Sequence, residues 1–396
     1  MFDEKRSVII KDGRKLSFDY VPDRLVHREE QMSTLRMLFR PVFEDGRCET
    51  AFLTGTVGTG KTATVKRFCA DMMTYGARTG LPLDYVIVNC RQRNSESAVV
   101  LQVLRHFDPG HPDRGFSVSE MLRTLRRQVD TKKIRLVIVL DEADILIKKN
   151  AVDLIYQLSR FNEENIGVTA SVSLILIAQE YILDSLDAAS LSTFKKSNTI
   201  KFGRYRRDEL RDIVKMRSDE ALLPGKIRDD AIDLIADISS EWGDARQAID
   251  ILDKAARSGE NKEKGIVTAE EVREAKAMIY SDVSESKLSD LDRNHMITLL
   301  AVCRCMKDKA YVTTGDAERT YAVVCEEYNE TARKHTQFWV YVQGLEKMSL
   351  LVTTVRGDAD GGRTTYISLP DIPSKVLAKK LEDLMDLRTA DASPYL

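Results

Sequence analysis

The chain has 396 residues, of which 31% are charged and 43% hydrophobic, and its formal net charge is −2. This composition excludes a disordered or low-complexity protein, and the length favours two or three domains. No apolar run approaches the roughly 20 residues that cross a bilayer, so we expect a cytoplasmic protein with no membrane partner, in which any contact with nucleic acid comes from a local basic surface.

Five short apolar segments alternate with amphipathic segments in the first half of the chain. They cover residues 50–54, 84–89, 135–140, 172–178 and 198–202. Buried strands that alternate with helices form a parallel sheet covered on both faces. The pattern therefore predicts an α/β domain, which we place over residues 1–204.

A glycine-rich loop follows the first of these strands directly. The segment 55–62 reads GTVGTGKT, which matches a Walker A phosphate-binding loop. Its glycines let consecutive backbone N–H groups surround an anion, Lys61 can reach the outer phosphates and Thr62 can ligate Mg²⁺. An ordinary glycine-rich turn is the alternative, but it does not account for the strand before the loop or the amphipathic segment after it. The residues predicted to bind ATP or ADP are Thr56, Val57, Gly58, Thr59, Gly60, Lys61, Thr62 and Ala63.

A second nucleotide motif ends the third strand. Residues 136–144 read LVIVLDEAD, an apolar strand that ends in acids as in a Walker B motif, and the spacing suits a strand adjacent to the first. Asp141 is predicted to hold Mg²⁺ through the water shell of the metal, and Glu142 to act as general base for the attacking water. Without the glycine-rich loop, these two acids would indicate only a solvated strand end or a helix cap. Asp144 fits a helix N-terminus better than a metal site.

Two further side chains are candidates for contact with the phosphates. Gln179 follows the fourth strand, and it can reach the γ-phosphate or the attacking water if that strand lies between the first and the third. Residues 205–282 form a predicted helical domain, because strand patterns give way to helical periodicity there. Arg246 lies near the start of one of these helices, where its guanidinium could bind phosphate. Taken by itself, it fits an exposed surface arginine better.

Residues 283–396 predict a winged-helix domain that follows the polar linker 281–286. Helical stretches near 289–306, 316–329 and 334–348 precede two strand-like segments, 350–355 and 364–369, which a glycine-rich turn joins. In a helix-turn-helix, the N-terminal end of the third helix faces the major groove.

The predicted DNA contacts lie at the start of the third helical stretch and in the wing. Basic and amide side chains precede apolar ones along the helix, so we expect Phe338, Val342 and Leu345 to form core. A solvated helix end is the alternative for each polar residue. The wing tip is glycine-rich and suited to minor-groove insertion. The candidate contacts are Arg333, Lys334, Thr336 and Gln337 in the helix and Arg356 and Arg363 in the wing.

Several motifs together resemble an archaeal replication initiator, a AAA+ protein related to eukaryotic origin recognition complex subunit one and cell division control protein six. The motifs are GTVGTGKT, LDEAD, GDAR at 243–246 and VPDRLVHREE at 21–30, followed by the winged helix. The resemblance covers nearly the whole chain and implies a AAA+ parallel-sheet domain, a helical lid and a C-terminal winged helix. It also implies that Leu25, Val26 and His27 line the adenine pocket and that Arg246 is a second sensor of the phosphates. In similar initiators a helical insertion at the place of residues 107–116 contacts DNA, which makes Arg114 a candidate phosphate contact; a plain loop is the alternative, because proline and glycine interrupt the helical pattern there.

The chain departs from this family pattern at two places. Gln179 stands where similar proteins usually carry an asparagine. Within the segment 186–190, Ala189 stands where the family often has an arginine that serves as a finger on a neighbour's nucleotide. Because such a finger contributes about 10³–10⁵-fold in rate, we expect this subunit to be a poor activator of a partner's ATP.

The sequence therefore predicts an ATP-dependent, nucleoid-associated initiator that binds replication origins. It is expected to be a weak ATPase, which converts ATP and water to ADP and phosphate with the catalytic residues Glu142, Lys61, Gln179 and Arg246, and in which slow hydrolysis acts as a switch. The implied partners are double-stranded origin DNA, a paralogous initiator subunit and the replicative helicase. The alternative is a nucleotide-gated transcription regulator or assembly scaffold with little hydrolysis. A clamp loader is disfavoured by the terminal winged helix.

Overall fold

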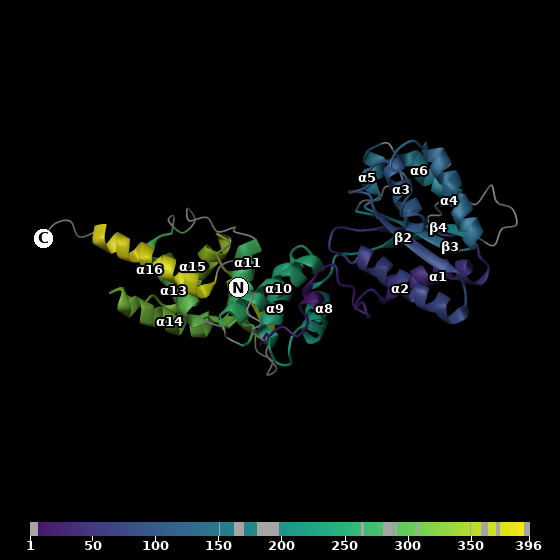
Figure 1. Cartoon of the computed structure of the whole chain (residues 1–396). Helices are drawn as coiled ribbons and strands as arrows, with labels where there is room; N and C mark the ends of the chain where they lie inside the picture. Colours follow the sequence, from purple (N-terminus) through teal and green to yellow (C-terminus); the bar gives the residue numbers. More distant parts are fainter. Residues whose placement is uncertain are drawn as a thin grey trace. The chain divides into compact units, whose positions relative to one another are not determined.

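The chain forms two compact units, and each is described by itself. The computed structural model describes residues 7–149, 151–161, 170–179, 198–262, 265–279, 288, 291–306, 309–348, 350–357, 363–369 and 373–391. One unit is Val21–Tyr205, and the other combines Met1–Tyr20 with Arg206–Leu396. Figure 1 labels the α-helices of both units and the strands β2, β3 and β4.

A five-stranded parallel sheet forms the centre of the first unit. The strands are β1 (Thr50–Thr54), β2 (Leu83–Asn89), β3 (Arg135–Asp141), β4 (Ser171–Ala178) and β5 (Thr199–Lys201), in the order β2-β3-β4-β1-β5. All five predicted strands are confirmed. The predicted adjacency of the first and third strands is wrong, because β4 lies between them. All eight residues of β4 are buried, which is the pattern of a central strand.

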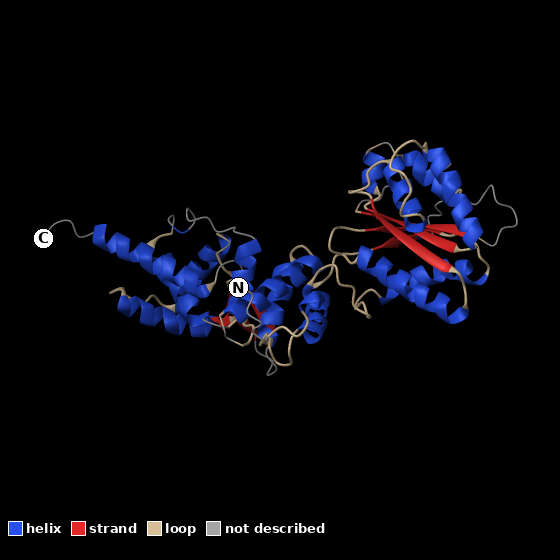
Figure 2. Ribbon diagram, in the orientation of Figure 1, coloured by secondary structure: helices blue, strands red, loops and turns tan. Residues whose placement is uncertain are grey.

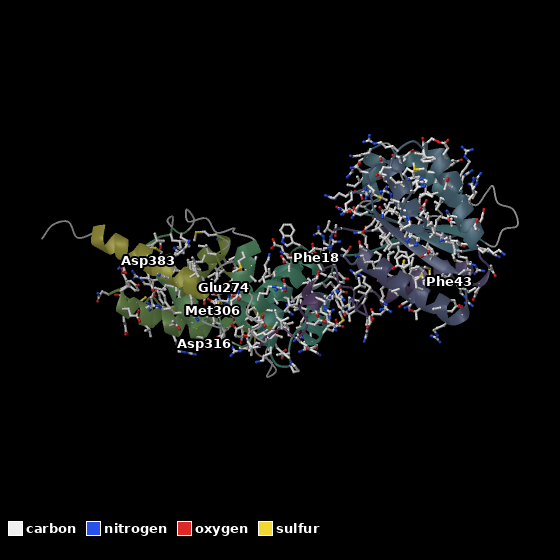
Figure 3. All side chains as sticks on the ribbon, in the orientation of Figure 1. Phe18, Phe43, Glu274, Met306, Asp316 and Asp383 are labelled. Carbon is white, nitrogen blue, oxygen red and sulfur yellow. The ribbon has the colours of Figure 1, made fainter. Side chains whose placement is uncertain are left out.

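Helices cover both faces of this sheet (Figure 2). Apolar residues of β3 alternate between two cores. Val137 and Val139 pack with helices α1 (Glu29–Glu44) and α2 (Lys61–Thr79), whereas Leu136 and Ile138 pack with the opposite layer. That layer contains α3 (Glu96–Phe107), α4 (Val118–Lys132), α5 (Asp144–Lys148) and α6 (Val152–Ser159). Phe43, labelled in Figure 3, lies near the end of α1, and its ring contacts those of Phe68 and Tyr75.

The second unit begins with the N-terminal segment and continues with lid helices. These elements are the 3₁₀ helix η1 (Gly13–Leu16) and the α-helices α8 (Arg207–Ala221), α9 (Asp229–Ser240), α10 (Ala245–Asn261) and α11 (Ala269–Ile279). Ile9 and Leu16 are buried, Lys11 N–H donates to the Ala221 carbonyl at 2.8 Å, and Arg217 donates to the Lys15 carbonyl at 2.9 Å. The sequence assigned this segment to the first domain, 1–204. The structure corrects the start of that domain, since this segment packs with the lid helices. The sequence did not indicate this, because Ile9 and Leu16 are isolated apolar residues that form no periodic pattern.

The winged helix completes the second unit. It consists of α13 (Arg293–Met306), β6 (Val312–Thr313), α14 (Thr314–Glu327), α15 (His335–Lys347), β7 (Val352–Gly357), β8 (Arg363–Ser368) and α16 (Ser374–Asp391). The strands form an antiparallel sheet in the order β6-β8-β7. The three predicted helices and the predicted hairpin are confirmed, and Met306, labelled in Figure 3, is fully buried in their core. The predicted linker 281–286 lies outside the described residues, so the boundary at 282/283 stays a prediction.

A buried ion pair joins the lid to the winged helix. Arg273 is 0% exposed and Glu270 is 1% exposed, with 3.3 Å between guanidinium and carboxylate. Arg273 also donates to the carbonyls of Leu369 and Lys309, and the Glu270 carboxylate accepts from the backbone N–H and hydroxyl of Ser374, at the start of α16. Arg273 and Glu270, both on lid helix α11, thus each form hydrogen bonds with groups of the winged-helix domain. Such pairs are costly to break because the remaining charge stays buried.

Replacement of Arg273 by alanine should lower the free energy of unfolding of this unit by about 3–5 kcal/mol, because it strands the Glu270 carboxylate. Both tryptophans, Trp242 and Trp339, lie in this unit, so urea titration followed by their fluorescence measures the change. Arg257→Ala is the control, since Arg257 pairs with Asp253 on the surface of α10. Its loss should cost no more than about 1 kcal/mol. Equal effects of the two substitutions would contradict the assignment.

Candidate nucleotide site and nucleic-acid interface

The Walker A segment connects β1 to α2 as a phosphate-binding loop. Gly60 caps α2 with a φ of 88°, a left-handed conformation that glycine adopts without strain, and α2 begins at Lys61. The Lys61 ammonium donates to the carbonyls of Gly55 at 2.5 Å and Thr56 at 2.8 Å, and only 8% of this residue is exposed. The loop therefore holds its own lysine beside the positive end of a helix, which is the arrangement that binds phosphate.

The two residues predicted to hold Mg²⁺ lie next to each other. The Thr62 hydroxyl donates to the Asp141 carboxylate at 3.0 Å, and Asp141 is 9% exposed at the end of β3. Hydroxyl and carboxylate oxygens are hard ligands that suit Mg²⁺, so the side chains fit the predicted metal. Cys90 lies close by, since its N–H donates to the Asp141 carbonyl at 2.8 Å. Burial, and then the Asp141 charge, raises the pKa of Cys90 to about 12, so its thiol stays protonated.

Glu142, the predicted general base, is held by an arginine that the sequence did not indicate. Its backbone has a φ of 56°, and its carboxylate lies 2.5 Å from the Arg91 guanidinium. The hydrogen bond to Glu142 raises the pKa of Arg91. Arg91 comes two residues after β2, and β2 pairs with β3 so that Asn89 lies opposite Asp141. Only the strand pairing brings Arg91 to the acid, so no local motif marks it.

Gln179 lies at the same edge of the sheet as the two Walker motifs. In the register of β1 and β4, Thr54 is paired with Ala178, so Gln179 follows β4 where Gly55 follows β1. The insertion of β4 between β1 and β3, on which this prediction depended, is confirmed. Gln179 is half-buried, and its contact with phosphate or water stays a prediction.

The predicted adenine segment lies against the phosphate loop. Leu25, Val26 and His27 are half-buried, and Leu25 packs on the core beneath α1 and α2. His27 has a φ of 61°, which is uncommon for a residue with a side chain. The next residue, Arg28, donates to the Thr59 carbonyl at 2.9 Å. The segment therefore reaches the loop through Arg28, a residue that sequence reasoning did not single out.

The predicted recognition helix α15 is divided as expected between core and surface. Phe338, Val342 and Leu345 are each 0% exposed, which confirms them as core residues. The DNA candidates on this helix and just before it are all exposed; they are Arg333, Lys334, Thr336 and Gln337. A row of exposed polar side chains over a buried apolar face is compatible with a major-groove helix.

Comparison with known proteins places all three domains. Protein-family models match at residues 44–186 (AAA domain), 211–277 (Cdc6 AAA+ ATPase-type lid domain) and 286–379 (CDC6, C terminal winged helix domain). The chain is 31% identical to ORC1-type DNA replication protein 2 of Saccharolobus solfataricus over 388 residues, which are 95% of this chain and 93% of that protein.

The chain belongs to the ORC1/Cdc6 family of DNA replication proteins. Two solved structures of family members are similar over their whole length. Cdc6p from Pyrobaculum aerophilum matches with a TM-score of 0.80 and 28% identity, covering 96% of this chain and 99% of that one. Aeropyrum pernix ORC1, in a structure with DNA, matches with a TM-score of 0.64 and 26% identity, covering 97% and 99%. The predicted AAA+, lid and winged-helix fold is thereby confirmed.

The structure does not test two other residues expected from the family. Arg246 is exposed in the first turn of α10. Asp244 caps the N-terminus of this helix, because its carboxylate accepts hydrogen bonds from the backbone N–H groups of Arg246 and Gln247. It belongs to the second unit, so its contact with phosphate stays a prediction. Ala189 lies outside the described residues.

The remaining DNA candidates of this ORC1/Cdc6-family chain lie on loops and strands. Arg114 is exposed in the loop between α3 and α4, where it lines a pocket with Phe116 and Met121. Arg356 and Arg363 lie near the facing ends of β7 and β8, while their side chains and the tip 358–362 are outside the described part of the chain. None of the helices formed by the described residues has an apolar stretch long enough to span a lipid bilayer.

The contact between Arg91 and Glu142 should restrain ATP hydrolysis, because a carboxylate engaged by a guanidinium is less available to accept a proton from water. Arg91→Ala should therefore raise the turnover number at saturating ATP, by about two- to fivefold given the strength of an exposed ion pair. The turnover number is measured from the rate of phosphate release by the purified chain without a partner protein. Arg93→Ala, an exposed arginine on the same loop, should leave the rate unchanged. An unchanged or lower rate in Arg91→Ala would show that the pair does not restrain the base.

Proposed function

We propose that this chain is an ATP-controlled initiator that binds duplex DNA at replication origins and hydrolyses ATP slowly. The observation that carries the proposal is the coexistence of an assembled nucleotide site in one unit and an exposed polar recognition helix in the other. The relative from Aeropyrum pernix whose structure includes DNA supports the DNA-binding part. ATP would set the protein in its DNA-binding state and hydrolysis would reset it.

The residues of the first unit support a simple hydrolysis scheme. Backbone N–H groups at the start of α2 and the Lys61 ammonium bind the β- and γ-phosphates. Thr62 and Asp141 would hold Mg²⁺, which neutralises charge on the phosphate oxygens when it is bound. Glu142 accepts a proton as water attacks the γ-phosphorus and the bond to the bridging oxygen of ADP breaks. Gln179, at the same edge of the sheet, would orient that water, and Arg246 would contact the phosphates from the lid.

Two features favour slow turnover. Glu142 is engaged by Arg91 rather than free to accept a proton. In addition, Ala189 takes the place at which similar proteins often carry the arginine finger, so a neighbouring copy of this chain would supply no finger to the nucleotide, and such a finger is worth about 10³–10⁵-fold in rate. A paralogous initiator that supplies the missing arginine is therefore the partner we propose on DNA. Recruitment of the replicative helicase is the proposed outcome of assembly.

On the DNA side, the proposed contacts divide by chemistry. Basic side chains supply the charge that binds phosphate, and amides and hydroxyls can donate to and accept from base edges in the major groove. Arg333 and Lys334 lie just before the first turn of α15 and are assigned to phosphate, and Thr336 and Gln337 are assigned to bases. Arg356 and Arg363 would enter the minor groove from the wing, and Arg114 would add a phosphate contact from the first unit.

Nucleotide binding should depend on the lysine of the loop. Lys61→Ala should weaken ATP binding about 10- to 100-fold, as expected from loss of charge-assisted hydrogen bonds. Isothermal titration calorimetry with Mg²⁺–ATP measures the affinity directly. Lys66→Ala is the matched control, because Lys66 lies one turn further along α2. Full affinity in Lys61→Ala would contradict the phosphate-loop assignment.

Binding to DNA should lose one phosphate contact when Lys334 is replaced by alanine. The affinity for duplex should fall for every sequence, and the slope of log K against log salt should become shallower by about one. Fluorescence anisotropy over a range of salt concentrations gives both values. Lys347→Ala, in the last turn of the same helix, should leave the slope unchanged. An unaltered slope in Lys334→Ala would indicate that this end of α15 points away from DNA.

A further inference from the structure

Arg28 is a buried cation that links three separate segments of the first unit. It is 5% exposed, and its Nε donates to the Thr59 carbonyl of the phosphate loop at 2.9 Å. Its Nη1 donates to the His27 carbonyl at 2.7 Å, and its Nη2 donates to the carbonyl of Gly203, after β5, at 2.9 Å. One planar guanidinium thus fixes the relative positions of the adenine segment, the loop and the turn after β5.

The turn after β5 lies very close to both ends of the glycine-rich phosphate loop, at Gly60 and at Gly55. The Arg28 guanidinium carbon lies 3.7 Å from the centre of the Tyr205 ring, a stacking distance for a cation on an aromatic ring. The Tyr205 hydroxyl would lie 2.6 Å from a Cβ placed on Gly60. At the other end, the Phe202 carbonyl would lie 2.3 Å from a Cβ on Gly55. The loop can only approach this turn so closely because glycine occupies both positions.

The adenine segment has a second attachment that does not involve Arg28. Asp23 pairs with Arg67 of α2 at 2.7 Å, and Leu25 packs on the core. The segment is therefore held on the domain at its start, whereas its end, at His27, is held by the hydrogen bond from Arg28. The left-handed backbone of His27, with a φ of 61°, is a conformation that surrounding contacts must maintain.

We propose that Arg28 is a positioning residue that joins adenine recognition to triphosphate recognition. The proposal rests on the nucleotide site described above. Arg28 holds the adenine segment at a fixed distance from the phosphate loop. A nucleotide can therefore contact the segment with its adenine and the loop with its phosphates at the same time, so that the adenine contacts add fully to the binding affinity. Lysine cannot replace it, because an ammonium group lacks the planar fork that binds three carbonyls and stacks on Tyr205.

The test compares ATP with inorganic tripolyphosphate, both with Mg²⁺, by calorimetry on the full chain. The ratio of the two affinities measures what the adenosine part contributes. In Arg28→Met, ATP affinity should fall about tenfold while tripolyphosphate affinity changes by less than about threefold, in line with the size of coupling between neighbouring groups. Discrimination between ATP and GTP should fall in parallel. Arg40→Met, which removes a surface arginine of α1 that pairs only with the exposed carboxylate of Glu44 among the ion pairs of the described residues, should keep the wild-type ratio.

Several outcomes would overturn the proposal. Equal losses for ATP and tripolyphosphate, with a lower melting temperature, would mean that Arg28 only stabilises the fold. If Arg28→Met does not fold, Arg28→Lys keeps the charge and should show the same fall in the ratio, whereas a wild-type ratio there would mean that charge alone suffices. Equal affinity of the wild-type protein for ATP and tripolyphosphate would refute the assignment of the adenine segment, but it would still agree with the assignment of the phosphate loop. Wild-type protein that binds neither would refute the nucleotide site itself.

Discussion

The parallel register of β1, β4 and β3 is the constraint on which the chemistry of this chain depends. It aligns the carboxyl ends of three strands, so that Gly55 after β1, Gln179 after β4 and Asp141 at the end of β3 lie at one edge of the sheet. The strands are apolar on both faces and therefore stable only between two helical layers. The same burial that stabilises the sheet holds Asp141 beside Thr62. Pre-organisation of this kind lowers the entropic cost of binding a metal–nucleotide complex.

The site is better organised for binding than for turnover. Arg28 connects the phosphate loop, the adenine segment and the turn after β5. Glu142, the proposed general base, is instead engaged by Arg91. A nucleotide bound in such a site would persist, and its identity would act as a signal. In the second unit, the buried pair of Arg273 and Glu270 joins lid to winged helix, so a change at the lid has a stiff connection to the DNA-reading domain. These features are consistent with the proposed switch.

Local patterns predicted most of the fold, while contacts between distant segments escaped the sequence. Buried strands and glycine-rich loops have short-range signatures, which is why β1 to β5 and the two Walker motifs could be placed in advance. The position of β4 in the middle of the sheet could not be read from spacing, and the adjacency expected for the third strand was wrong. No motif contained Arg91, and the motif at 21–30 contained Arg28 without indicating its role, because both side chains act through contacts with distant segments. The two-residue strand β6 is too short for any periodic signal.

The central claim, that nucleotide state controls DNA binding, is tested most directly by the thermodynamic linkage between the two ligands. The affinities for ATP and for ADP should each be measured by calorimetry with and without saturating duplex from the organism's own origins. A switch requires that the duplex change the ratio of ATP to ADP affinity, by about fivefold or more, and that ATP strengthen DNA binding relative to ADP by the same factor. An identical ratio with and without DNA would contradict the switch, even if both ligands bind tightly.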